Sequence, residues 1–274
     1  MPELPEVETV MQGLRARLEG RRIARAEVRR ADLRWPFPPG LTDRLTGARV
    51  IGFRRRGKYI LMRLDLGDSV LIHLGMSGAL AFGRGLPPAG KHDHFELQTT
   101  HGLLRLHDPR RFGAVVYAPS EDHPRAAKLL GHLGVEPLEE GFDPRLFWQQ
   151  LKKSRASIKQ VLLAGALVVG VGNIYASESL FLAGIRPTVR ANRLSLARVQ
   201  RLHQAIRVVL GQAIEQGGSS LRDFSNAQGQ TGYFQLQAQV YDRQGLPCRV
   251  CEQPIKRLVQ GQRATYFCPQ CQKP

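Results

Sequence analysis

The sequence predicts a multidomain α+β chain, in which an antiparallel β domain precedes a helical domain and a small C-terminal hairpin. Three observations predict this order. Short apolar runs broken by Gly, Pro and Asp fill residues 22–118, helical periodicity follows from residue 155, and all four cysteines lie after residue 247. The 274 residues suffice for about two domains of ordinary size and a small module.

The N-terminal domain is expected to contain one helix and a set of strands. Residues 1–20 begin with a proline-rich stretch and turn helical, with Val7, Val10, Met11, Leu14 and Leu18 on one face and Gly20 as the stop. The expected strands are Val50–Phe53, Tyr59–Leu64, Ser69–Leu74, Phe95–Thr99, Leu103–His107 and Ala114–Tyr117. Because these strands follow one another without helices, we expect an antiparallel sandwich or barrel.

In the second half of the chain, the spacing of apolar residues changes from a strand-like to a helical pattern. Four prolines and several acidic residues make 119–144 a linker with at most short helices. Helices are expected over Arg155–Leu167, Ile174–Ala183 and Leu196–Gln216, the last with Ser195 as N-cap and Gly217-Gly218 as the stop. Residues 219–237 are rich in Ser, Gly, Asn and Gln, which is typical of a mobile loop. The expected domains are 1–118, a hinge over 119–150, a helical domain with its loop over 151–237, and a zinc hairpin over 238–274.

The cysteine spacing predicts a metal site. Cys248 and Cys251 form one C-x2-C pair, and Cys268 and Cys271 form a second. Two such pairs close a tetrahedron of thiolates around one Zn²⁺, and a site with four protein ligands is structural. Two disulfides are the alternative, but disulfides are rare in reducing compartments, and no N-terminal apolar stretch indicates export. We therefore expect a cytoplasmic protein whose hairpin is held by zinc.

The charge of the chain indicates a polyanionic partner. The formal net charge is +17, and the basic residues occur in clusters such as 54–56, 110–111 and 152–155. In a folded, zinc-bearing protein this distribution favours nucleic acid, although a merely solvated basic surface explains part of the charge. No run approaches the ~18 apolar residues that a membrane span needs.

Two short segments offer candidate chemistry. Residues 169–173 (Val-Gly-Val-Gly-Asn) lack the third glycine of a dinucleotide loop, and they fit a turn between helices that presents backbone N–H groups and Asn173 to a phosphate. A plain interhelical turn is the alternative. At the N-terminus, removal of Met1 would leave Pro2 with a secondary amine, whose attack on an aldehyde-level carbon gives a cationic iminium. Glu3 and Glu6 are near enough in sequence to handle protons.

Together these motifs resemble a known family. They are Pro2–Thr9 (PELPEVET), Arg56–Tyr59 (RGKY), His73–Gly78 (HLGMSG), Lys91–His94 (KHDH), Asp108–Gly113 (DPRRFG), Val171–Glu178 (VGNIYASE), and the zinc hairpin with Gln262–Thr265 (QRAT). In this order they are similar to the bacterial formamidopyrimidine-DNA glycosylases, which are 8-oxoguanine-DNA glycosylases and AP lyases. The resemblance implies an N-terminal β-sandwich with a flanking helix. It also implies a C-terminal helix-two-turn-helix domain with a loop that caps the lesion and a zinc-bound hairpin.

The resemblance also implies a reaction. A monomeric, nucleoid-associated repair enzyme would excise oxidised purines from double-stranded DNA and cleave the strand by β,δ-elimination, without a redox cofactor. Pro2 would attack C1′, Glu3 would act as general acid on the deoxyribose, and Lys58 would contact phosphate and assist β-elimination. Arg263 in the zinc hairpin would contact the lesion phosphate and assist δ-elimination. An ordinary strand lysine in a basic hairpin is the alternative for Lys58, although the flanking Gly57 and Tyr59 match the family.

Further residues would contact the duplex. Met76, Arg110 and Phe112 would fill the space of the extruded nucleotide, since something must replace the base when it leaves the stack. Composition alone favours core packing for Met76 and Phe112. Contacts to the DNA backbone are expected from His92, Lys153, Arg155, Lys159 and Asn173.

Two other functions fit parts of the sequence. The sister group resembling endonuclease VIII shares Pro2-Glu3 and the zinc hairpin, but it has a different pattern after Glu3 and lacks the Arg-Arg-Phe segment. A non-catalytic zinc-hairpin protein that only binds DNA is the other alternative. The chain also departs from the family at Ala164-Gly165, where an acidic residue is common.

Overall fold

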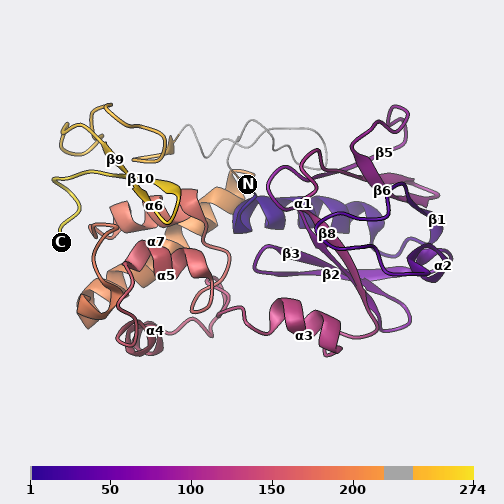
Figure 1. Cartoon of the computed structure of the whole chain (residues 1–274), viewed down its shortest axis with the longest axis horizontal. Coiled ribbons are helices and arrows are strands. Elements are labelled where there is room, and N and C mark those ends of the chain that lie inside the picture. Colours follow the sequence, from indigo (N-terminus) through magenta and orange to yellow (C-terminus); the bar gives the residue numbers. More distant parts are fainter. Residues whose placement is uncertain (1, 219–236) are drawn as a thin grey trace. The chain divides into compact units, whose positions relative to one another are not determined.

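The computed structural model describes residues 2–218 and 237–274 (Figure 1). The chain divides into two compact units, residues 1–132 with 216–233 and residues 133–215 with 234–274. The loop expected over 219–237, including its proposed lesion-capping part, lies almost wholly outside the described residues. Among the helices that are described, none is long and apolar enough to cross a bilayer.

The first unit contains two antiparallel four-stranded sheets. One has the order β1-β6-β7-β5 and the other β2-β3-β4-β8. Their bounds are β1 Ile23–Val28, β2 Val50–Arg56, β3 Tyr59–Leu64, β4 Ser69–His73, β5 Ala79–Gly83, β6 Asp93–Thr99, β7 Gly102–His107 and β8 Ala114–Ala118. The antiparallel sandwich expected from consecutive strands is confirmed, and all six expected strands are present.

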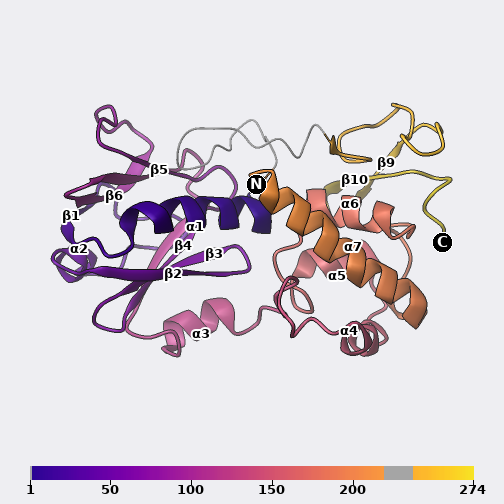
Figure 2. The same ribbon diagram turned by 180° about the vertical axis from the view of Figure 1, so that it is seen from behind.

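Helix α1, Leu4–Leu18, flanks these strands and supplies part of their core (Figure 2). Its apolar face, from Val7 to Leu18, is buried in one cluster with inward residues of both sheets, such as Ile60 and Phe95. The helix ends where expected, because Gly20 has a φ of 80° that a residue with a side chain rarely adopts. A short helix, α2 (Leu41–Leu45), was not expected from the sequence.

A second apolar layer covers the opposite face of the sheet β2-β3-β4-β8. Helix α3, Pro124–Leu130, packs there through Ala126, against Leu61 and Leu71 of the sheet. Alternate residues of β3 and β4 therefore point to opposite faces, and both faces of this sheet are buried, which explains its continuous apolar runs.

The second unit is helical and ends in the cysteine-bearing hairpin. Its elements are α4 Pro144–Leu151, α5 Ile158–Ala164, α6 Asn173–Leu182, the 3-10 turn η1 Ala191–Arg193, α7 Leu196–Glu215, β9 Lys256–Gln260 and β10 Arg263–Phe267. Helix α5 is shorter than the expected Arg155–Leu167. Ser157 caps it by accepting a hydrogen bond from the N–H of Gln160, and Gly165 ends it with a φ of 70°.

Candidate functional site

The first predicted site residues lie at the start of α1. Pro2 is buried, and Glu3 is the N-cap of the helix. Glu3 and Glu6 form a reciprocal capping box, in which each carboxylate accepts the backbone N–H of the other, with 2.7 Å between Glu3 N and Glu6 Oε2. The backbone of Glu3 is therefore fixed one residue after Pro2 by the side chain of Glu6.

Lys58 lies in the two-residue turn between β2 and β3. Arg56 pairs with Tyr59, and Gly57 has the φ of 56° that a tight hairpin turn requires at its first central position. Arg55 fastens this hairpin to α1, since its guanidinium lies 2.6 Å from Glu8 Oε2 and also donates to the Gly57 carbonyl at 3.2 Å. The position of the Lys58 backbone is thus tied to the helix that begins after Glu3.

His73, at the end of β4, was quoted in a motif but given no role by the sequence. It pairs with Tyr59 across the strands, and the two rings lie 4.8 Å apart. Burial, followed by the positive charges of Lys58 and Arg34, lowers the pKa of His73 to about 4. Its Nδ1 accepts the Gly75 N–H at 3.0 Å, so the neutral ring carries its proton on Nε2. A neutral donor therefore lies beside Lys58.

Asp108 organises the loops that carry Met76, Arg110 and Phe112. Its carboxylate accepts from Ser77 Oγ at 3.1 Å, from the Arg110 N–H at 3.3 Å and from the Gly113 N–H at 2.7 Å. Asp108 is completely buried. Sequence reasoning gave it no role, although a buried acid followed by Pro-Arg-Arg is a recognisable turn signal.

The two loops also touch through their backbones. A Cβ at Gly75 would lie 2.3 Å from the carbonyl carbon of Phe112, so only glycine fits there. The side chains nevertheless point outward: Met76 is 39 % and Phe112 45 % exposed, and the Arg110 guanidinium lies 4.9 Å from the Phe112 ring. Core packing, the alternative for Met76 and Phe112, is therefore excluded.

His92 lies beside the same loop. Its carbonyl accepts the Asp108 N–H at 2.9 Å, and its half-buried ring meets the His107 ring edge-on at 5.9 Å. The loop residues and His92 are therefore neighbours in the first unit.

In the second unit, Asn173 and Lys159 both bind the hairpin strand β10. Asn173 Nδ2 and Lys159 Nζ donate to the Ala264 carbonyl at 3.0 and 3.1 Å, and Lys159 also donates to Thr265 Oγ1 at 2.8 Å. Lys159 is wholly buried. It therefore does not fit the phosphate contact expected of it, and it instead anchors the hairpin.

Arg263 follows the hairpin turn directly. The two turn residues, Gly261 and Gln262, have φ of 53° and 63°, as in a type I′ turn. This turn leaves Arg263 exposed next to the anchored Ala264. Lys153 and Arg155 are also exposed, in the loop between α4 and α5.

The four cysteines meet at the base of this hairpin. All four are free thiols, and their sulfur atoms lie within 4.8 Å of one another. The Cys251–Cys268 and Cys248–Cys271 sulfurs are 3.4 and 3.9 Å apart, close to the ~3.8 Å of a tetrahedral Zn–S₄ site. The four thiols fit one structural Zn²⁺, and the disulfide alternative is wrong.

Glu178 is another residue that the sequence left without a role. It is buried on α6, and its carboxylate accepts the N–H groups of Gln239, Val240 and Tyr241 at 2.8–3.0 Å. Burial raises the pKa of Glu178, and the three N–H groups oppose that rise. The residue fixes the chain where it enters the zinc hairpin.

Comparison with known proteins identifies this arrangement. The formamidopyrimidine-DNA glycosylase N-terminal domain matches residues 1–115, the H2TH domain of the same enzymes matches 133–225, and the zinc finger found in FPG and IleRS matches 245–274. The chain belongs to the formamidopyrimidine-DNA glycosylase family. It is an enzyme of the DNA glycosylase and AP lyase class, with the helix-two-turn-helix domain and zinc finger expected from its motifs.

Individual relatives agree over their full lengths. Formamidopyrimidine-DNA glycosylases from Albidiferax ferrireducens and Bordetella pertussis are 60 % and 55 % identical, with complete coverage of both chains. The crystal structure of the MutM (Fpg) protein of Thermus thermophilus superposes with a TM-score of 0.89 at 39 % identity, covering 99 % of this chain and 98 % of that one. Lactococcus lactis Fpg in complex with abasic-site DNA gives 0.91 at 38 % identity, with 99 % and 100 % covered.

Proposed function

We propose that this chain removes oxidised purines from double-stranded DNA through a Schiff base on Pro2 and then cleaves the strand by β,δ-elimination. Family membership supports base-excision repair. Solved relatives hold DNA that contains Fapy-dG, carbocyclic 8-oxoguanine or an abasic site. The observation that carries the mechanism is the buried Pro2 immediately before the Glu3 N-cap, where any Met1 would occupy the proline nitrogen.

The proline nitrogen is the nucleophile. Once Met1 is removed, this nitrogen attacks C1′, the bond from C1′ to the base nitrogen breaks, and the electron pair leaves with the base. Glu3 donates a proton to the ring oxygen, so the deoxyribose opens to an iminium on Pro2. The iminium then serves as the electron sink for both eliminations.

The eliminations assign roles to the other residues. Loss of a C2′ proton expels the 3′-phosphate, and Lys58 contacts phosphate and assists this transfer. Arg263 assists the second elimination, which expels the 5′-phosphate. Met76, Arg110 and Phe112 occupy the vacated space in the duplex. His92, Lys153, Arg155 and Asn173 contact the backbone, and the exposure of Lys153 and Arg155 supports this.

We also propose the domain division as 1–118, 119–150, 151–237 and 238–274, with a monomer acting on the nucleoid in the cytoplasm. The zinc holds the hairpin, and so serves to position Arg263.

The N-terminus provides the test. A mature chain that begins at Pro2 should be trapped covalently on 8-oxoguanine DNA by borohydride, with the adduct on Pro2 by mass spectrometry. A chain that retains Met1 should bind the same DNA but neither release the base nor cut the strand, because its proline nitrogen is an amide. Normal excision by the Met1-bearing chain would overturn the mechanism.

A second variant separates base removal from strand cleavage. Glu3→Gln should block excision of 8-oxoguanine yet retain cleavage of a pre-formed abasic site, where the glycosidic bond is already gone. The same duplexes with oxidised pyrimidines distinguish this activity from that of the sister group. Preferential excision of the pyrimidines would contradict the proposed substrate class.

A further inference from the structure

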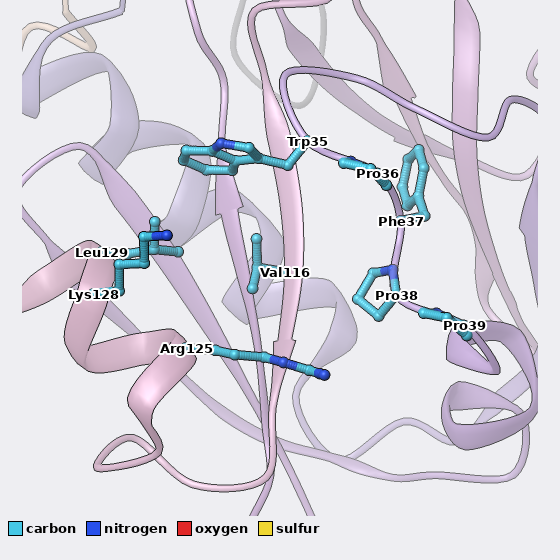
Figure 3. Close-up of a pocket in the computed structure, with 9 residues that line it drawn as sticks. All are labelled: Trp35, Pro36, Phe37, Pro38, Pro39, Val116, Arg125, Lys128 and Leu129. Carbon is cyan, nitrogen blue, oxygen red and sulfur yellow. The ribbon is translucent and has the colours of Figure 1, made fainter.

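A hollow on the first unit lies between helix α3 and the segment Trp35–Pro39 (Figure 3). Its volume is about 310 Å³, at the small end of ligand-binding pockets. Val116 of β8 lies between the two walls, and Leu129 of α3 completes the apolar lining. None of the residues that line it has a part in the reaction proposed above.

The wall formed by Trp35–Pro39 is firmly held. The Phe37 N–H donates to the Ala31 carbonyl at 3.1 Å, and the Phe37 ring stacks on Phe95 of the core at 6.0 Å. Three of the five wall residues are prolines, which have no N–H. This wall therefore presents apolar surface and cannot pair with a partner as an added strand.

Two cations border the hollow. Arg125 and Lys128 lie on the exposed side of α3, and within the described residues no carboxylate lies within ion-pair distance of either. The nearby Glu121 is already engaged by Arg54 and by Arg63, the latter at 2.9 Å. Both cations of the hollow are therefore available to an outside anion.

The hydrogen-bonding groups of the lining side chains favour an acidic peptide over a nucleotide base as the partner. Trp35, Arg125 and Lys128 offer donors, and no lining side chain offers an acceptor. A nucleotide base would stack on the indole, but its amino groups would find no side-chain acceptor there. An acidic peptide places only its apolar side chain in the hollow and its carboxylates on the donors, while its backbone N–H groups can stay in water, so it matches both the charge and the chemistry.

We propose that this hollow is a docking site for an acidic protein segment that carries an aromatic or aliphatic anchor residue. The anchor fills the space between Trp35 and Leu129, and the neighbouring carboxylates pair with Arg125 and Lys128. The site is independent of the glycosylase reaction and would connect this enzyme to another protein.

The probe is a synthetic peptide in which a run of aspartates precedes Leu-Phe, titrated against the full chain. Trp35 is one of only two tryptophans, so a Trp148→Phe background makes indole fluorescence report on the hollow alone. Binding should change this fluorescence. A peptide with alanines in place of Leu-Phe keeps the charge, and it should bind at least about tenfold more weakly because the apolar burial is lost.

The net charge of +17 attracts any acidic peptide. A variant that reverses the charges at the hollow therefore needs a control with the same change of charge elsewhere. Arg125→Glu/Lys128→Glu should weaken binding about tenfold or more, since contacts between charged groups are lost. The control is Arg21→Glu/Arg84→Glu, which makes the same charge change at a different hollow of the same unit. It should retain the fluorescence change with at most a small loss of affinity.

Three results would overturn the proposal. These are equal binding of the anchored and alanine peptides, equal weakening by the two double variants, and a fluorescence change with single-stranded oligothymidylate but not with the peptide. DNA incision should be the same in the two double variants, which separates this site from the reaction. Failure of the Pro2 mechanism would leave these peptide measurements unaffected.

Discussion

Lys159 Nζ lies 3.1 Å from the carbonyl oxygen of Ala264, the residue that follows Arg263. The amine is wholly buried, and Asn173 donates to the same oxygen. A polar group buried this deeply is costly unless it is hydrogen-bonded, so these contacts fix the amine in place. It makes the position of Arg263 depend on α5 and α6 as well as on the metal.

Lys159→Met should therefore impair the second elimination, as loss of the Arg263 side chain would. Removing the amine takes the donor from the buried Thr265 Oγ1 and leaves the Ala264 carbonyl with its bond from Asn173, at a cost of about 1–3 kcal/mol, and it loosens β10. The ratio of δ- to β-elimination products, measured on gels with abasic-site DNA, should fall. Lys273→Met, which changes an exposed lysine of the same unit, is the control.

A double-mutant cycle decides how Lys159 acts. Combined with Arg263→Ala, Lys159→Met should add little further loss of the second elimination, because both affect one group. Full additivity of the two losses would contradict a role through Arg263.

The outward-pointing side chains of Arg110 and Phe112 give a second prediction. Phe112→Ala and Arg110→Ala should lower excision of 8-oxoguanine more than cleavage of an abasic site, because an abasic site already lacks the base that must be unstacked. Phe112 is 45 % exposed, so its truncation should change the melting temperature little. Leu66→Ala, at an exposed apolar residue of the same unit, should affect neither activity. Equal losses on both substrates would indicate general damage.

The sequence predicted the strands of both sheets where apolar runs were dense, and it missed β1 and β5. The reason is visible in their residues: β1 reads Ile-Ala-Arg-Ala-Glu-Val, with charges between its few apolar residues, and β5 consists largely of Ala and Gly. Such strands form because hydrogen bonds to the neighbouring strands stabilise them. A local sequence pattern does not reveal this tertiary effect.

In the candidate site, too, the sequence predicted some residues and missed others. The residue type and spacing of the cysteines predicted the metal site, and the motif at the N-terminus led to the candidates Pro2 and Glu3, whose roles stay a prediction. Lys159 was expected to contact the DNA backbone, and only its buried contact with the hairpin shows otherwise. The Asp108 carboxylate accepts two of its three hydrogen bonds within its own turn, but the bond from Ser77 spans 31 positions, and no local pattern predicts it.

Metal removal tests the zinc finger. We expect about one Zn²⁺ per chain, released by Cys268→Ser or by strong chelation. Because the hairpin has little core of its own, its hydrogen-exchange protection should be lost, while the strands of the first unit stay protected. DNA binding should weaken in parallel. Full incision activity in a metal-free sample would contradict the role given to the hairpin.

Backbone contacts to DNA should appear in the salt dependence of binding. Lys153 and Arg155 are both exposed, and each phosphate contact contributes roughly one unit to the slope of log K against log salt. Lys153→Ala or Arg155→Ala should lower the slope by about that amount. Lys273→Ala is the matched control, and a slope unchanged by the first two variants would identify them as solvated surface charges.

The neutral state of His73 should make stability depend on pH. Its pKa lies near 4 in the folded chain, because burial and then the charges of Lys58 and Arg34 disfavour the imidazolium, whereas the unfolded value is 6.5. The unfolded state therefore binds the proton first as the pH falls. The stabilisation is full above pH 6.5 and is lost toward pH 4, amounting to about 2 kcal/mol between pH 7 and pH 5.

His73→Asn isolates this contribution, since its amide oxygen can still accept the Gly75 N–H but does not titrate in this range. Urea unfolding of the first unit should show a smaller fall in free energy between pH 7 and pH 5 for the variant than for the unchanged chain. The contribution of the carboxylates to the pH dependence cancels in this comparison, because they titrate in both proteins. An identical pH dependence would show that folding leaves the pKa of His73 unchanged, which would contradict the lowered value in the folded chain.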